Sequence, residues 1–230
     1  MPEAAAICRM FADVAPGYDR ANRALSLGID RWWRRRTVAV VDVRAGEHGL
    51  DVCAGTGDLS FALQRAGAEI VGSDFCAPMV VLARAKAARV PSPPSFLAAD
   101  AMRLPFADGA FDFATVAFGI RNVSDPVVAL REMARVVRPG GRVVVLEFCK
   151  PTVPVLGALY RGYFRNVLPR LGRWISGARS DAYRYLHDSV MAFPEREQFL
   201  DLMRTAGLQA PRQRLLTCGI AAIYRGEVTG

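Results

Sequence analysis

The chain of 230 residues has the size of one α/β domain. Its net charge of +8 is compatible with binding to nucleic acid or to anionic lipid, and equally with an arginine-rich surface that only faces water. No run approaches the roughly 18 apolar residues of a membrane span, and no signal-peptide pattern opens the chain, so we expect a cytosolic protein. Five scattered cysteines and two histidines, His48 and His187, leave little for a metal site or a Ser-His-Asp triad, so no metal is expected.

The first 45 residues predict a helical, basic cap on the domain. Trp32 and Trp33 stand there beside three consecutive arginines at positions 34–36. We expect this cap and the rest of the chain to form one domain spanning residues 1–230.

Residues 49–148 alternate strand-like and helix-like patterns, which is typical of βαβ units around a parallel sheet. Buried strands are expected at residues 49–53, 69–73, 96–99, 111–118 and 142–148. Helices are expected at residues 58–66, from Pro78 and from Asp125, the last ended by a turn at residues 138–141. A helix at 195–206 and strands at 209–216 and 220–225 follow.

Residues 151–190 interrupt this alternation with a mixture of apolar, aromatic and arginine residues. An insertion of this kind between the fifth strand and the last helix predicts a helical lid over the substrate. Its basic and aromatic composition also predicts contact with a membrane surface.

A glycine turn marks the predicted ligand site. Gly55, Thr56 and Gly57 follow the first strand and open a helix, an arrangement in which a ligand can approach the backbone and the helix N-terminus. Dinucleotide-binding folds use the same turn, but their fingerprint requires a third glycine where this chain has Ser60.

Three acidic residues help to distinguish a dinucleotide site from another kind of ligand site after the same glycine turn. Asp51 lies on the first strand, Asp74 ends the second, and Asp100 follows the third. Asp51 can orient the loop and the amino group of a ligand, Asp74 suits ribose hydroxyls, and Asp100 suits an adenine amino group. Acids at the carboxyl ends of consecutive strands fit a ligand that lies across the crevice of a sheet.

Several longer motifs carry a resemblance that covers nearly the whole chain. They are residues 11–19 (Phe-Ala-Asp-Val-Ala-Pro-Gly-Tyr-Asp), 27–33 (Leu-Gly-Ile-Asp-Arg-Trp-Trp), 104–112 (Leu-Pro-Phe-Ala-Asp-Gly-Ala-Phe-Asp), 118–123 (Phe-Gly-Ile-Arg-Asn-Val), 138–142 (Arg-Pro-Gly-Gly-Arg), 146–151 (Leu-Glu-Phe-Cys-Lys-Pro) and 183–186 (Tyr-Arg-Tyr-Leu). With them the chain resembles the UbiE/MenG-type quinone C-methyltransferases.

The resemblance implies a class I S-adenosylmethionine-dependent methyltransferase, an α/β fold with a Rossmann-like, mostly parallel seven-stranded sheet whose last strand is antiparallel. It places cofactor contacts on Thr56, Asp74, Asp100 and Ala101. Ala117 stands where family members often have serine, which would remove one polar contact with the cofactor.

The implied reaction is C-methylation of a prenylated quinol, which requires a ring carbon activated by loss of a hydroxyl proton. Arg121 and Asn122, just past the fourth strand, are the best candidates to act on it, while the sequence does not identify the general base. Tyr18, Tyr183 and Asp188 match family positions beside the site and are weaker candidates. His48 and His187 are expected to be structural.

The acceptor is predicted to be demethylmenaquinol, with the 2-methoxy-6-polyprenyl-benzoquinol of ubiquinone biosynthesis as a second candidate. Another lipid or small molecule, a nucleic acid, and a non-catalytic binding module are the alternatives. The amine-methylating Asn/Asp-Pro-Pro-Tyr/Phe motif does not follow the fourth strand, so we expect no nucleic-acid partner. A second copy of the chain is a further candidate partner.

Overall fold

The computed structural model describes residues 7–10, 12, 18–151 and 181–229. The strands are β1 (His48–Val52), β2 (Glu69–Asp74), β3 (Ser95–Ala98), β4 (Phe111–Ala117), β5 (Val137–Phe148), β6 (Gln209–Leu216) and β7 (Ala221–Glu227). The helices are α2 (Tyr18–Leu25), α3 (Ile29–Val41), α4 (Asp58–Arg65), α5 (Ala77–Ala87), α6 (Pro126–Val136), α9 (Asp181–Ala192) and α10 (Glu197–Thr205), with the 3-10 turns η2 (Ile120–Asn122) and η4 (Thr217–Gly219).

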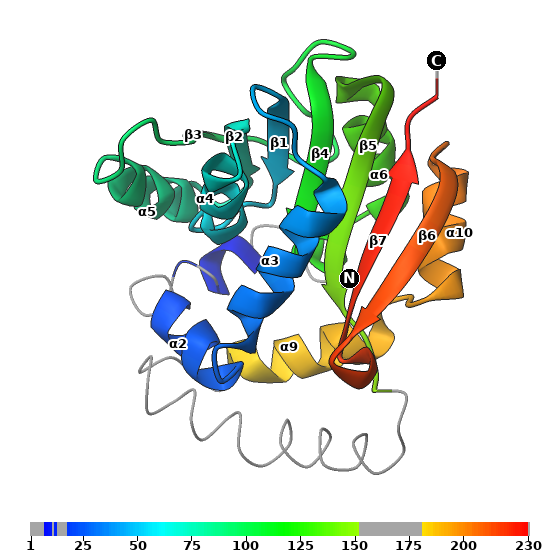
Figure 1. Ribbon diagram of the computed structural model, residues 1–230. Coiled ribbons are helices and arrows are strands. Elements are labelled where there is room, and N and C mark those ends of the chain that lie inside the picture. The colour runs from blue at the N-terminus through cyan, green and yellow to red at the C-terminus, as the bar shows by residue number, and fades with distance from the viewer. Residues whose placement is uncertain (1–6, 11, 13–17, 152–180, 230) are drawn as a thin grey trace.

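The seven strands form one sheet in the order β3-β2-β1-β4-β5-β7-β6 (Figure 1). Strands β1 to β5 pair in parallel, whereas β7 is antiparallel to both β5 and β6. The prediction of a mostly parallel seven-stranded sheet with an antiparallel last strand is therefore confirmed.

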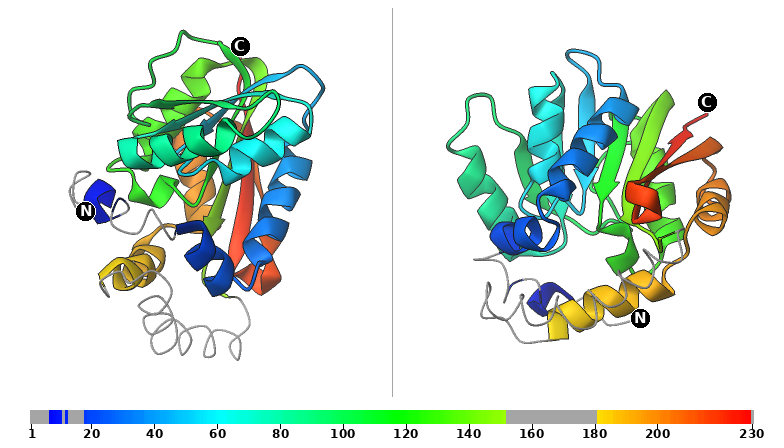
Figure 2. Two further views of the ribbon diagram at one scale, coloured as in Figure 1. Left: turned by 90° about the vertical axis from the view of Figure 1, so that its left-hand side faces the viewer. Right: turned by 60° about the horizontal axis from the view of Figure 1, so that its bottom comes forward.

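Helices cover both faces of the sheet, as the views in Figures 1 and 2 show: α3, α4 and α5 lie on one face, α6 and α10 on the other. Alternate residues of β5 supply both cores. Val143 and Val145 belong to the core beneath α6 and α10, and Val144 and Leu146 to the core beneath α3 and α4. A strand buried on both faces has to be almost continuously apolar, which explains why this segment is readable as a strand.

Local signals set the helix boundaries. Asp125 caps α6, accepting hydrogen bonds from the backbone N–H groups of Val127 and Val128 at 2.9 and 3.1 Å, and Pro126 occupies the first helical position, where a missing N–H has no cost.

One predicted turn is different in the structure. Residues 138–141 were expected to separate the helix from the strand, but they lie within the bounds of β5. The β4–β5 register shifts there, between Phe111 and Phe113, as in a bulge. The carboxyl end of the chain holds this segment, because Gly140 donates to the carbonyl of Val228 at 2.8 Å and Val228 donates to Gly141 at 2.9 Å.

The predicted cap and lid are partly described. Helices α2 and α3 fall within the cap. Helix α9 begins in the second half of the lid and extends past its predicted end at residue 190, whereas residues 152–180 lie outside the described residues. Figure 1 places α2 and α9 at the end of the sheet where the parallel strands terminate. No helix in the described ranges is long and apolar enough to cross a membrane.

Candidate active site

The glycine turn after β1 has the backbone shape that its residues predict. Gly55 and Gly57 adopt left-handed conformations, with φ of 57° and 87°. A Cβ atom on Gly57 would lie 2.6 Å from the ring of Phe96, so a side chain there would require that ring to move as well as a strained backbone. At Gly55 a Cβ would meet nothing closer than 4.0 Å, which leaves the backbone open to a ligand.

Asp74 holds this turn at the end of β2. Its two carboxylate oxygens accept hydrogen bonds from the backbone N–H of Gly55 at 2.7 Å and of Cys76 at 2.8 Å. Burial raises the pKa of Asp74, and these two bonds oppose the shift. A carboxylate has about four acceptor positions, so Asp74 keeps capacity for ligand hydroxyls.

Asp51 is almost completely buried at the start of the glycine turn. It is 1% exposed, and its oxygens accept hydrogen bonds from Ser60 Oγ at 2.5 Å and Thr115 Oγ1 at 2.9 Å. These bonds join β1 to α4 and β4, in accordance with the predicted role in orienting the loop. Burial raises the pKa of Asp51 to about 6. Contact with the amino group of a ligand stays a prediction.

The remaining cofactor candidates lie along the same edge. Asp100 accepts a hydrogen bond from the backbone N–H of Met102 at 2.9 Å, Ala101 is buried beside it, and Ala117 ends β4 half-buried. The backbone at Asp100 is fixed by an isolated bridge to Arg103. The strand order places the ends of β3, β2, β1 and β4 next to one another, so these residues lie along one edge of the sheet.

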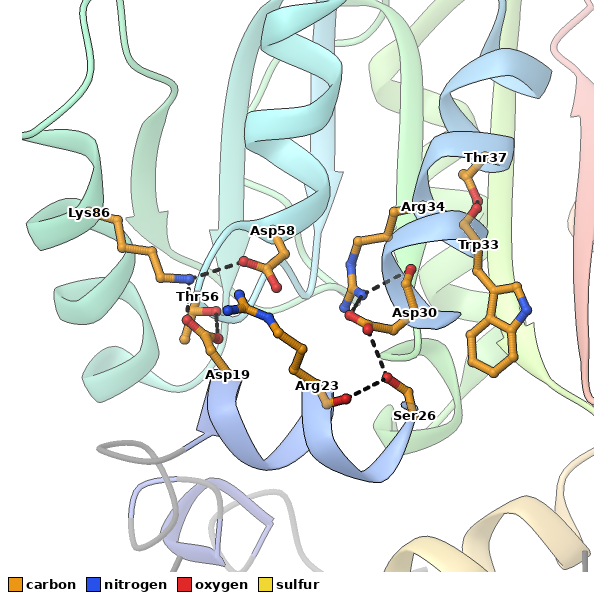
Figure 3. Close-up of polar contacts among 10 residues, drawn as sticks. All are labelled: Asp19, Arg23, Ser26, Asp30, Trp33, Arg34, Thr37, Thr56, Asp58 and Lys86. Atoms are coloured by element: carbon orange, nitrogen blue, oxygen red, sulfur yellow. Dashed lines mark hydrogen bonds and ion pairs between the residues drawn. The ribbon is translucent and has the colours of Figure 1, made fainter. Parts of the chain in front are cut away.

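Thr56 forms a contact that the sequence did not predict. Its hydroxyl donates to Asp19 of α2 at 2.6 Å, and Lys86 bridges Asp19 at 2.5 Å and Asp58 at 3.1 Å (Figure 3). Helix α2 is thereby fastened to both the glycine turn and α5. The signal in the sequence was the acid at the end of residues 11–19.

Arg121 is a buried ion-pair partner. Its Nη1 atom lies 2.7 Å from Glu147 Oε1 and donates to the carbonyl of Phe118 at 2.6 Å, while its guanidinium lies over the ring of Phe148. The exposed fractions of the Arg121 and Glu147 side chains are 6% and 2%. Burial raises the pKa of Glu147, and the charge of Arg121 opposes that shift.

Glu147 is not among the site residues predicted from the sequence. A charged residue inside the apolar run of β5 was the available signal, because such a residue needs a buried partner. Within the described part of the chain, Arg121 Nε and Glu147 Oε2 are buried without a hydrogen-bond partner. A donor and an acceptor thus remain beside the pair.

Asn122 contacts the described part of the lid, since its Oδ1 atom accepts a hydrogen bond from the Tyr185 hydroxyl of α9 at 3.0 Å. Asp188, on the same helix, is exposed and lies 3.0 Å from His187 Nδ1. Tyr18 begins α2 and Tyr183 lies in α9, but their side chains are outside the described part of the structure. The structure therefore joins Arg121 and Asn122 to the strand ends and leaves the other three as predictions.

These features fit S-adenosylmethionine. An open glycine turn, a fixed carboxylate at the end of β2 and a second acid after β3 match the amino-acid, ribose and adenine portions of that molecule in order along the sheet edge. Helix α4 begins at this turn, with Gly57 as its N-cap, so its N-terminal amides face the same region.

Comparison with solved structures defines the class. A methyltransferase of Thermotoga maritima that depends on S-adenosylmethionine superposes with a TM-score of 0.66 at 21% identity, covering 96% of this chain and 99% of that chain. A putative S-adenosylmethionine-dependent methyltransferase of Methanococcus maripaludis gives a TM-score of 0.68 at 16% identity, with 94% and 92% covered. The fold is therefore that of the class I S-adenosylmethionine-dependent methyltransferases.

Sequence comparison then gives the family. Residues 2–227 match the model of the ubiE/COQ5 methyltransferase family, and the chain belongs to that family. It is 51% identical to the demethylmenaquinone methyltransferase of Thermus thermophilus, with 95% of this chain and 99% of that protein covered. It is 46% identical to the ubiquinone/menaquinone biosynthesis C-methyltransferase UbiE of Bdellovibrio bacteriovorus, with 99% and 97% covered. The resemblance read from the motifs is confirmed.

Proposed function

We propose that this enzyme transfers the methyl group of S-adenosylmethionine to a ring carbon of a prenylated quinol, converting demethylmenaquinol to menaquinol. The observation that carries the proposal is identity of 46–51%, over nearly the full length of both chains, to relatives named for this reaction. The Bdellovibrio relative is also named for ubiquinone biosynthesis, which supports the corresponding benzoquinol as a second acceptor.

S-adenosylmethionine would supply a methyl group bound to a positively charged sulfur. The nucleophilic ring carbon would bond to this methyl carbon, and the sulfur would leave as a neutral thioether. Asp74 would hold the ribose hydroxyls, Asp100 with the Ala101 backbone the adenine, and the turn at Gly55–Gly57 the amino-acid portion. Because the reaction needs alignment more than covalent help, correct positioning can contribute roughly 7–11 kcal/mol to lowering the barrier.

Arg121 and Asn122 are proposed to act on the quinol. The ring carbon becomes nucleophilic as a hydroxyl proton leaves, and negative charge develops on oxygen. Glu147 fixes the guanidinium of Arg121 at 2.7 Å, so its remaining N–H groups keep one orientation. Donors fixed beforehand stabilise developing charge without the cost of reorganisation. Glu147 is thus a positioning residue for Arg121.

The lid, the membrane contact and the homodimer stay predictions. Support for a lid comes from α9, whose Tyr185 hydroxyl reaches Asn122. Tyr18, Tyr183 and Asp188 are retained as candidate site residues on α2 and α9.

The decisive test is to identify the acceptor. We expect the purified enzyme to transfer label from methyl-labelled S-adenosylmethionine to demethylmenaquinol, and not to an RNA or a phospholipid offered in parallel. Lipid extracts of a deletion strain should accumulate the demethylated quinone. Labelling of the RNA, or a normal quinone profile in the deletion strain, would contradict the proposal.

A further inference from the structure

An apolar surface formed by Leu27, Ile29 and Trp32 is exposed where α2 meets α3. Leu27 is 84% exposed, Trp32 is 40% exposed and Ile29 is 37% exposed. Leu27 and Gly28 both adopt left-handed conformations, with φ of 51° and 77°, and this turn directs the leucine away from the core. Trp33, the next residue after Trp32, is buried and donates to Thr217 at 2.8 Å, so α3 presents one tryptophan inward and one outward.

A basic groove of about 640 Å³ lies beside this surface, between α3 and α4. Its apolar lining includes Val38 and Phe61. Its charged lining consists of Arg23, Asp30, Arg31, Arg34, Arg35, Asp58, Arg65 and Lys86.

The two acids of the groove both have ion-pair partners, although Asp58 shares its lysine with Asp19. Asp30 pairs with Arg34 at 2.6 Å, and Asp58 pairs with Lys86 at 3.1 Å (Figure 3). The four other arginines are exposed and have no ion pair among the described residues; they are Arg23, Arg31, Arg35 and Arg65. The groove therefore has an excess of positive charge, carried chiefly by Arg31, Arg35 and Arg65.

The apolar surface lies at the end of the molecule that carries the site, and the groove extends from there along α3 and α4. Helix α2 is fastened to the glycine turn through Asp19 and Thr56, and Figure 1 places the α2–α3 turn at the end of the sheet where the parallel strands terminate. Arg36, whose guanidinium lies over the ring of Trp32, adds a further positive charge at the edge of the apolar surface.

We propose that the α2–α3 turn and the adjacent groove form a docking surface for an anionic lipid bilayer. Phosphate headgroups would lie against Arg23, Arg31, Arg35 and Arg65, and Leu27 and Trp32 would enter the interfacial layer. Exposed apolar residues next to basic ones are the combination that binds at a bilayer interface, where tryptophan is enriched. A nucleic acid would use the arginines but would leave Leu27 and Ile29 exposed to water.

This inference deepens the proposed function, because a prenylated acceptor is dissolved in the bilayer and must be taken from it. Docking here would bring the bilayer to the edge of the sheet at which the cofactor candidates gather. The bilayer is inferred from the exposed apolar and basic residues alone, so its binding to this surface can be tested without any quinol substrate.

The test is co-sedimentation of the full chain with vesicles of phosphatidylcholine, alone or mixed with phosphatidylglycerol. We expect binding to the mixed vesicles at low salt and its loss at high salt. Arg31→Glu/Arg35→Glu should weaken partitioning at least about tenfold, since each basic residue near an anionic leaflet contributes on the order of 1 kcal/mol. Trp32→Ala should weaken it too and remove the blue shift of tryptophan emission that vesicles cause.

The matched control is Arg44→Glu/Arg131→Glu, which makes the same change of net charge at two exposed arginines, one between α3 and β1 and one on α6, both away from the α2–α3 turn. It should leave vesicle binding unchanged, and circular dichroism should show all variants folded. Equal loss in the control, no binding by the wild-type chain, or displacement of the vesicles by RNA would overturn the proposal. Turnover of a short-tailed, water-soluble quinol should be equal in wild-type and Arg31→Glu/Arg35→Glu enzymes, which separates failure of docking from failure of the proposed function.

Discussion

Arg121 and Glu147 come from different elements, η2 and β5, and meet as a buried ion pair with 2.7 Å between Nη1 and Oε1. Removing either charge would leave the other buried without a partner. Such a loss typically costs more than the pair contributes as a whole. Variants of this pair are therefore expected to change both the free energy of unfolding and the turnover.

We predict that Arg121→Met lowers turnover far more than it lowers affinity for S-adenosylmethionine. The single variant should also lose about 3–5 kcal/mol of unfolding free energy, because Glu147 is left buried and charged. Arg121→Met/Glu147→Gln should regain part of this stability but none of the turnover. Steady-state kinetics, calorimetric titration and denaturation of the three proteins test this. Recovery of turnover in the double variant would show that Arg121 is only structural.

We predict that Asp74→Asn weakens binding of S-adenosylmethionine by about 3 kcal/mol, or roughly 150-fold. The carboxylate would lose its charge-assisted bonds to the ribose hydroxyls, while the amide oxygen still accepts one backbone bond of the turn. Asp201→Asn, on the exposed side of α10, is the matched control. An unchanged dissociation constant in calorimetric titration of Asp74→Asn would rule out the ribose role.

We predict that Thr56→Val loosens α2 without unfolding the domain. The variant loses the 2.6 Å bond to Asp19, worth about 1 kcal/mol, and leaves Lys86 to hold that helix. Amide hydrogens of α2 should exchange faster than in the wild-type chain. Thr205→Val, which removes a threonine bond to the Asp201 carbonyl in α10, should not change exchange in α2. Equal exchange of the α2 amides in Thr56→Val and in the wild type would contradict the role of Thr56 in holding α2.

We predict that Asp51 makes the free energy of unfolding depend on pH. Its pKa is raised from 3.8 to about 6 by burial, so the folded state holds this proton more tightly than the unfolded state. The stabilisation is therefore complete below about pH 4 and is lost as the pH rises to about 6, a difference of roughly 3 kcal/mol. Subtracting the unfolding free energy of Asp51→Asn from that of the wild type isolates this group. A difference that stays constant from pH 4 to 7 would contradict the shift.

The sequence by itself determined the sheet, the glycine turn and the family. The buried parts of strands such as β4 and β5 are covered on both faces and so are mostly apolar, and Gly55 and Gly57 adopt left-handed backbone conformations that favour glycine. These constraints act on residues close together in the chain, and the same holds for the Asp125 cap of α6. They are therefore visible as local patterns.

Only the tertiary structure decided how distant residues are paired. Glu147 lies 26 positions from Arg121, and Asp19 lies 37 positions from Thr56, so neither contact leaves a local pattern. Burial, too, depends on packing: the carboxylate of Asp51 is enclosed by Ser60 and Thr115, which come from two other elements. Which arginines face the groove unpaired was likewise fixed by the packing of α3 against α4, because charge counts alone cannot assign partners.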